Sequence, residues 1–66
     1  MSIRDYWREI EAALGHHCEV ILNPAGQGWH VQIKTHSGDS LAVAQAPMLP
    51  AAVLKALEAA HKRVVG

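Results

Sequence analysis

Two histidines and the only cysteine of the chain stand at three consecutive positions, His16, His17 and Cys18, and these residue types bind metals or act as nucleophiles. A structural zinc site needs four ligands, usually in pairs separated by about two to five residues. Neighbours in an extended chain point to opposite sides, so at most His16 and Cys18 could face one metal. The spacing therefore predicts neither a metal site nor a cofactor.

Cys18 opens a segment with the alternation of a strand, and we expect its thiol to act as a small apolar group on the core side. A catalytic thiol needs a lowered pKa, supplied by a helix N-terminus or a nearby cation. Cys18 instead follows the negative C-terminal end of a predicted helix, where His16 and His17 fit as weak cations. The three residues are therefore predicted to be a helix end followed by a strand start.

No arrangement of the acidic residues favours catalysis, because none of them forms a pair in an apolar setting that would separate two pKa values. The turn within residues 23–30 contains glycines but leads into a strand, so it lacks the helix N-terminus of a phosphate-binding loop. A chain of 66 residues also has little room for a substrate pocket. We therefore expect no enzyme activity and no small-molecule substrate.

Hydrophobic periodicity predicts a helix, three strands and a second helix. Apolar residues spaced by three and four predict a helix over residues 3–14, between a capping box at Ser2 and Asp5 and a C-terminal cap at Gly15. Alternation predicts strands that begin at about residue 18, at residue 29 and at residue 40. Pro50 suits the first turn of a final segment with high helix propensity.

Short loops favour antiparallel neighbours, and a sheet with one apolar face needs a cover. We therefore expect a single α+β domain over residues 1–66, an αβββα two-layer sandwich with a three-stranded antiparallel sheet and both helices on one face. In the second strand, Val31 and Ile33 should face the helices. In the third strand, Leu41 and Val43 should point inward.

The opposite side of the sheet is the candidate contact surface. A polar stripe on the second strand is flanked there by one larger apolar residue and by alanines, which let a partner approach closely. The predicted partner-binding residues are Ile21, His30, Gln32, Lys34, Ala42 and Ala44. A merely solvated face is the alternative, and an edge strand could instead accept a strand from a second copy.

Composition argues against nucleic acid as the default partner and against a secreted or membrane protein. Six basic residues balance six acidic ones, so the chain lacks the excess positive charge that attracts proteins to nucleic acid. One cysteine cannot form an internal disulfide, and no stretch approaches the roughly 18 apolar residues of a membrane span. The N-terminal segment is charged where a signal peptide would be apolar. We expect a cytoplasmic protein with no membrane partner.

The order of elements over the full chain resembles the double-stranded RNA-binding domain, which has a similar length. That family binds RNA through its first helix, a Gly-Pro-x-His loop and a lysine-rich start to its last helix. Here the loop "AGQGWH" keeps a glycine and His30 without the full motif, and the last helix begins with only one lysine. The resemblance implies nucleic-acid binding as an alternative function, carried by Lys55, Lys62 and Arg63.

The chain also resembles small accessory proteins of phages and prophages, including anti-CRISPR proteins. The likeness lies in its size, its short amphipathic helix, its hairpin-rich centre and its alanine-rich final helix after a proline-containing connector. Many such proteins act by covering a surface of a host protein. The resemblance implies a non-catalytic inhibitor or regulator of a host complex such as a CRISPR effector. Because the core is small, a homodimer is a further expectation.

Overall fold

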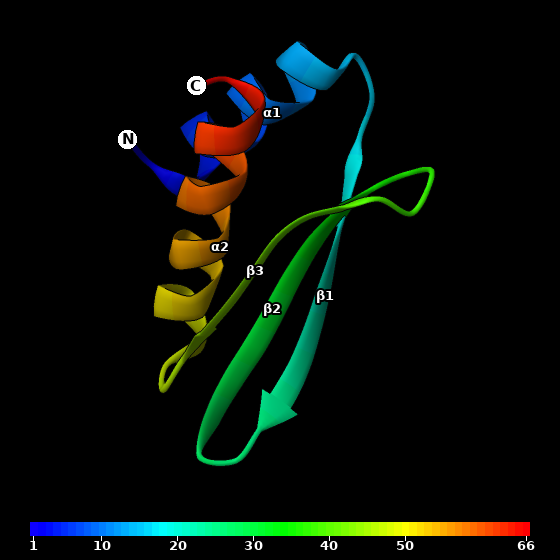
Figure 1. Cartoon of the computed structure of the whole chain (residues 1–66). Coiled ribbons are helices and arrows are strands. Elements are labelled where there is room, and N and C mark those ends of the chain that lie inside the picture. Colours follow the sequence, from blue (N-terminus) through cyan, green and yellow to red (C-terminus); the bar gives the residue numbers. More distant parts are fainter.

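The computed structural model describes residues 1–66 and contains five elements in the predicted order (Figure 1). The sheet is antiparallel with strand order β1-β2-β3, and both helices lie on one side of it. The predicted α+β sandwich is thereby confirmed. The elements are α1 (Ile3–Leu14), β1 (Cys18–Ala25), β2 (Gly28–Thr35), β3 (Ser40–Ala46) and α2 (Leu49–Val64).

Helix α1 begins and ends at its predicted caps. The backbone N–H of Asp5 donates to Ser2 Oγ at 3.1 Å, and the Ser2 N–H donates to Asp5 Oδ2 at 3.3 Å. Hydrogen bonding of the Asp5 carboxyl group by the Ser2 backbone N–H, and then by the Ser2 hydroxyl, lowers the pKa of this carboxyl group. At the other end Gly15 has φ 80°, and its N–H donates to the Glu11 carbonyl at 2.9 Å. Local sequence therefore defines both ends of this helix.

A two-residue turn, Gly26-Gln27, joins β1 to β2. Gly26 has φ 60° and no residue other than glycine has a positive φ, which fits a type II′ turn with glycine at its first central position. Beside the turn, Gly28 lies so close to β3 that an added Cβ would be 2.5 Å from the Ala46 carbonyl oxygen. Glycine at position 28 therefore permits the close approach of β2 to the end of β3.

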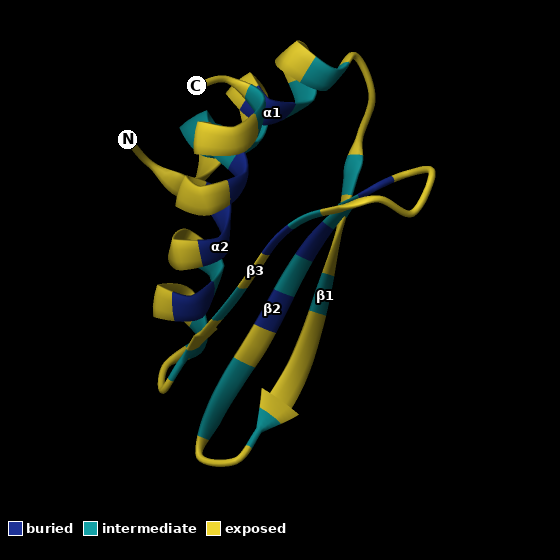
Figure 2. Ribbon diagram, viewed as in Figure 1, coloured by how far each residue is buried: buried dark blue, intermediate teal, exposed yellow.

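Helix α2 is the main cover of the sheet and lies over β2 and β3. Its buried face consists of three alanines and one leucine, and Figure 2 shows this buried stripe turned toward the strands. Small side chains let the helix backbone approach the sheet closely. The fully or nearly buried core residues are Ile10, Val31, Ile33, Ala42, Ala52, Ala56, Leu57 and Ala60. Val31 and Ile33 thus face the helices as predicted.

The orientation predicted for β3 was wrong. Ala42 pairs with Ile33 and is only 9% exposed, whereas Val43 on the opposite side is 55% exposed. Ala42 and Ala44 therefore lie on the helix side of the sheet, because α2 passes so close that only small side chains fit beneath it. A bulge opposite Ile33 also interrupts the alternation, and it leaves Leu41 half-buried against the core.

The cover is uneven across the sheet. Helix α1 packs mainly on α2, and no helix lies over most of β1. Val20 pairs with Ile33 and Leu22 pairs with Val31, so both face the helix side. Their exposed fractions are nevertheless 37% and 44%. Val20 and Leu22 thus point toward the helix side, but among the strands only β2 and β3 contain buried residues.

Candidate functional site

The side of the sheet turned away from the helices carries a central row made of Ile21, Gln32 and Val43, one residue from each strand. Val43 is 55% exposed. Ile21 and Gln32 are half-buried by their neighbours. We call this side of the sheet the open face. Two aliphatic side chains, Ile21 and Val43, flank the polar Gln32 in this row, and Val43 is accessible to water.

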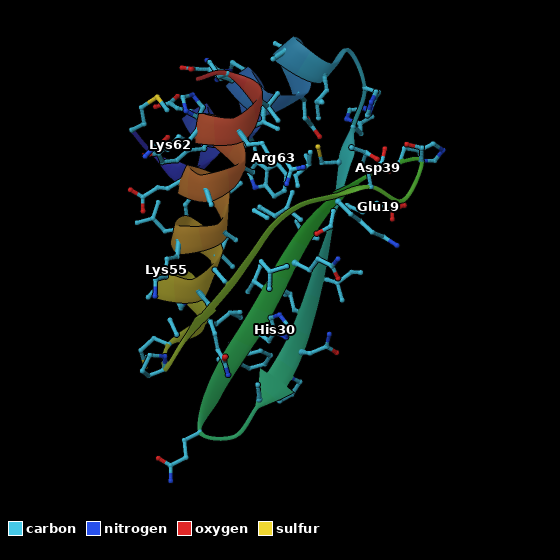
Figure 3. All side chains as sticks on the ribbon, viewed as in Figure 1. Glu19, His30, Asp39, Lys55, Lys62 and Arg63 are labelled. Atoms are coloured by element: carbon cyan, nitrogen blue, oxygen red, sulfur yellow. The ribbon has the colours of Figure 1, made fainter.

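Polar residues border the central row on both sides. Toward the β1–β2 turn lies a row of Asn23, His30 and Gln45, and His30 is exposed (Figure 3). On the opposite border, Lys34 Nζ lies 3.8 Å from Glu19 Oε2. The border is thus neutral on one side and charge-compensated on the other. Recognition by this face must come from hydrogen bonding and apolar contact.

The structure brings four of the six predicted partner-binding residues together on the open face and separates two from it. The two that lie elsewhere are Ala42 and Ala44, which face α2. Sequence reasoning missed Val43. A signal for it was present in the sequence. The alanines at every fourth position of α2 indicate a helix that packs closely on a strand, and such a strand would turn its alanines, not its valine, toward the helix. The four that share the face are Ile21, His30, Gln32 and Lys34.

The histidine and cysteine cluster forms the junction between α1 and β1. Glu11 Oε2 accepts a hydrogen bond from the Cys18 N–H at 3.1 Å and lies 3.3 Å from His17 Nδ1. Burial and then the charge of Glu11 raise the pKa of the Cys18 thiol, which disfavours the reactive thiolate. No group of three His, Cys, Asp or Glu side chains converges in the chain. The cluster therefore connects a helix to a strand.

A second polar contact joins the two helices. His61 Nε2 on α2 lies 2.8 Å from Glu9 Oε1 on α1, and the His61 side chain is 20% exposed. The ring of Tyr6 meets the His61 ring edge-on, with centroids 5.2 Å apart and an interplanar angle of 77°. The partners are 52 positions apart in sequence, so no local pattern indicated this contact. It fixes α1 against α2.

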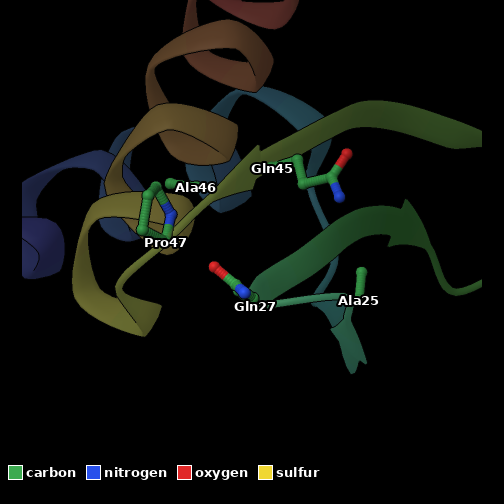
Figure 4. A pocket seen from close by; sticks show the side chains of 6 residues that line it. Ala25, Gln27, Gln45, Ala46 and Pro47 are labelled. Atoms are coloured by element: carbon green, nitrogen blue, oxygen red, sulfur yellow. The ribbon is translucent and has the colours of Figure 1, made fainter.

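A shallow pocket of about 460 Å³ lies at the turn end of the sheet, where the β1–β2 turn faces the β3–α2 connector (Figure 4). Its walls offer backbone groups and the amides of Gln27 and Gln45, with no acid, base or nucleophile. The pocket can accept hydrogen-bonding groups but contains no chemistry of its own. Its lining residues are Ala25, Gln27, Gly28, Gln45, Ala46 and Pro47.

The three cations of the nucleic-acid alternative all lie on the exposed surface of α2 (Figure 3). Glu58 stands three residues after Lys55 and four before Lys62, so a carboxylate shares their face of the helix. Lys55 also points toward β3, where its Nζ lies 3.4 Å from the Gln45 carbonyl oxygen. Lys55, Lys62 and Arg63 therefore do not form an uninterrupted basic cluster.

No family model, curated protein or solved structure matches the chain. None of its helices combines the length and the apolar character that crossing a membrane requires. The open face and the sheet edges are the features of the chain that bear on its function.

Proposed function

We propose that the chain is a non-catalytic module that binds another protein through its open face. The observation that carries the proposal is the exposure of Val43, 55%, in a central row that no helix covers. Protein interfaces combine apolar contacts with a polar rim, and this row offers Ile21 and Val43 on either side of Gln32 with polar residues beyond them. The same strands are held from behind by the buried core, so binding would order few additional groups.

The chemistry of the face defines the partner it suits. Ile21 and Val43 offer apolar contact, while His30, Gln32 and Gln45 offer hydrogen bonds without net charge. The partner would present an apolar side chain to the central row and backbone or amide groups to its border. A more specific form of the proposal is an inhibitor or regulator of a host complex, as in the phage proteins that the chain resembles. It would act by covering a surface.

The test is affinity capture by the immobilised chain, followed by measurement of the affinity for the captured protein. Val43→Arg places a charge in the central row and should weaken binding at least tenfold, because an unpaired charge would be desolvated at the interface. Leu54→Arg is the matched control, since Leu54 is 36% exposed on α2 and away from the open face. A folded Val43→Arg variant that binds as tightly as the unchanged chain would contradict the proposal.

Duplex RNA is the competing outcome. A labelled duplex titrated at low and moderate salt should show no binding, because the α2 cations are interrupted by Glu58. Binding that falls steeply with salt and is lost when Lys55, Lys62 and Arg63 are replaced by alanine would instead establish the nucleic-acid function.

A further inference from the structure

The outer edge of β1 has backbone groups without partners, and the turn defines which ones they are. Ala25 and Gly28 flank the two-residue turn and form a hydrogen-bonded pair, so every second residue back from Ala25 bonds to β2. The residues between them direct N–H and C=O away from the sheet. The hydrogen bond from the Cys18 N–H to Glu11 agrees with this alternation. The outward positions are Cys18, Val20, Leu22 and Pro24.

Both ends of this row are closed. The Cys18 N–H already donates to Glu11 Oε2 at 3.1 Å, and Pro24 has no N–H. The free donors of the edge are therefore the N–H groups of Val20 and Leu22. The side chains of the same two residues are 37% and 44% exposed on the helix side of the sheet. Free backbone groups and uncovered apolar surface thus coincide at one place.

We propose that β1 pairs antiparallel with β1 of a second copy of the chain, about a twofold axis that passes through Ile21. Val20 then lies opposite Leu22 of the second copy, and Leu22 lies opposite its Val20, with both backbone hydrogen bonds exchanged in each pair. The two Ile21 side chains meet across the axis on the open face. Each residue pair occurs twice, as a twofold interface requires.

The chain itself selects this register. An axis at Leu22 would place Val20 opposite Pro24, which cannot donate a hydrogen bond. An axis at Val20 would place Leu22 opposite Cys18, whose N–H is already used by Glu11. In both of these registers the carbonyl of one free residue receives no hydrogen bond in return. Only the axis at Ile21 pairs the two free donors with each other, so that Val20 and Leu22 exchange both hydrogen bonds.

The same register also suits the side chains. It covers Val20 of one copy with Leu22 of the other, which buries the apolar surface that no helix reaches. It places Glu19 opposite Asn23 of the second copy, so no two like charges meet directly. This match of the strand with itself is the reason to assign the edge to a second copy and not to an unrelated protein. The dimer does not depend on the open-face proposal.

One strand from each copy makes a small contact, below about 1,200 Å² of buried surface, so we expect association in the micromolar range or weaker. Sedimentation of the chain over a concentration series should show the mass rising from monomer to dimer. Leu22→Pro should prevent the rise, because it removes an outward donor. It should not disturb β2 pairing, since Pro24 already occupies the equivalent position two residues further along.

Val43→Pro is the matched control, because Val43 directs its N–H outward from the other edge strand and should leave the dimer intact. Circular dichroism would verify that both proline variants are folded. A chain that stays monomeric over the whole series would overturn the proposal. So would a dimer that Val43→Pro abolishes and Leu22→Pro does not.

A disulfide tests the register without depending on a proline. In a Cys18→Ala background, Ile21→Cys places two thiols on residues whose Cα atoms would be about 4.5 Å apart, within the range of a disulfide. Mild oxidation should link most of the chain into covalent dimers. Glu19→Cys in the same background is the control, because the two cysteines would lie about 13 Å apart along the strands. Equal linkage of the two variants would refute the Ile21 axis.

Discussion

At the β3 side the sheet lies beneath α2, whereas at the β1 side it faces water. Helix α2 lies over β3, a bulge interrupts the strand near Leu41, and Lys55 Nζ approaches the Gln45 carbonyl oxygen at 3.4 Å. Along β1, Val20 and Leu22 keep free backbone groups and exposed side chains. Bulges and lysines are common means of preventing strands from pairing between molecules. The difference favours the β1 edge for the sheet extension proposed above.

The cause of the difference lies in side-chain size. Ala42 and Ala44 on β3 face the alanines of α2, which allows the helix to sit directly on this part of the sheet. β1 carries larger aliphatic residues at the corresponding positions, and no alanine face is turned toward it. Burial, and with it most of the stabilisation, is therefore concentrated in β2, β3 and α2.

The largest expected effect compares one leucine from each region. Leu57→Ala on α2 should lower the free energy of unfolding by about 2–5 kcal/mol, because the Leu57 side chain is 0% exposed and its removal leaves a cavity. Leu22→Ala on β1 should lower it by less than about 1 kcal/mol in dilute solution, since Leu22 is 44% exposed. Urea unfolding followed by circular dichroism measures both. Equal losses would mean that β1 is as well packed as α2.

Gly28→Ala tests the close approach between β2 and the end of β3. The added methyl group would lie 2.5 Å from the Ala46 carbonyl oxygen, a backbone atom that cannot rotate away. We expect the free energy of unfolding to fall by about 1–3 kcal/mol, as at other overpacked sites. Amide hydrogen exchange should show faster exchange at the Trp29–Ala46 end of the β2–β3 pairing. A variant as stable as the unchanged chain would show that this approach can relax.

Glu11→Ala tests the closed end of the exposed edge. This substitution should lower the free energy of unfolding by about 1 kcal/mol, because the half-buried Cys18 N–H loses its hydrogen bond. Glu11→Gln should also lower the raised pKa of the Cys18 thiol, since it removes a nearby negative charge. Alkylation of Cys18 near neutral pH should then become faster. Glu19→Gln, on the open face, is the control and should leave the alkylation rate unchanged.

Lys55→Ala should have the smallest effect and change the free energy of unfolding by less than about 0.5 kcal/mol, because the contact to the Gln45 carbonyl is long and exposed. If the lysine contributes to protecting β3, its removal still leaves the bulge and α2 in place. Sedimentation should therefore show the same association as the unchanged chain. Stronger self-association of this variant would mean that Lys55 is the main protection of that edge.

The features that the sequence predicted correctly are those with local causes. The capping box at Ser2, the left-handed glycine at position 15 and the alternation of β2 each act within a few residues. The helix order, the strand order and the direction of Val31 and Ile33 followed from them.

The errors arose where distant elements meet. Alternation indicates which way a side chain points but not whether anything covers it, so the exposure of Val20 and Leu22 could not be predicted. Nor could local sequence reveal that α2 would select Ala42 over Val43 for the buried side. Part of the candidate site was misplaced for this reason, while the residues of β1 and β2 on the open face were placed correctly.

The contact between the two helices has a consequence for the order of events during synthesis. Ile10 on α1 is buried in the same cluster as Leu57 and Ala60 on α2, and the sheet offers α1 little other support. A ribosome adds roughly 5–20 residues per second, so Ile10 stays unprotected for seconds while the strands are translated. The nascent chain can bury Ile10 only after Leu57 and Ala60 have been synthesised, which makes the docking of α1 one of the last steps in assembling this interior.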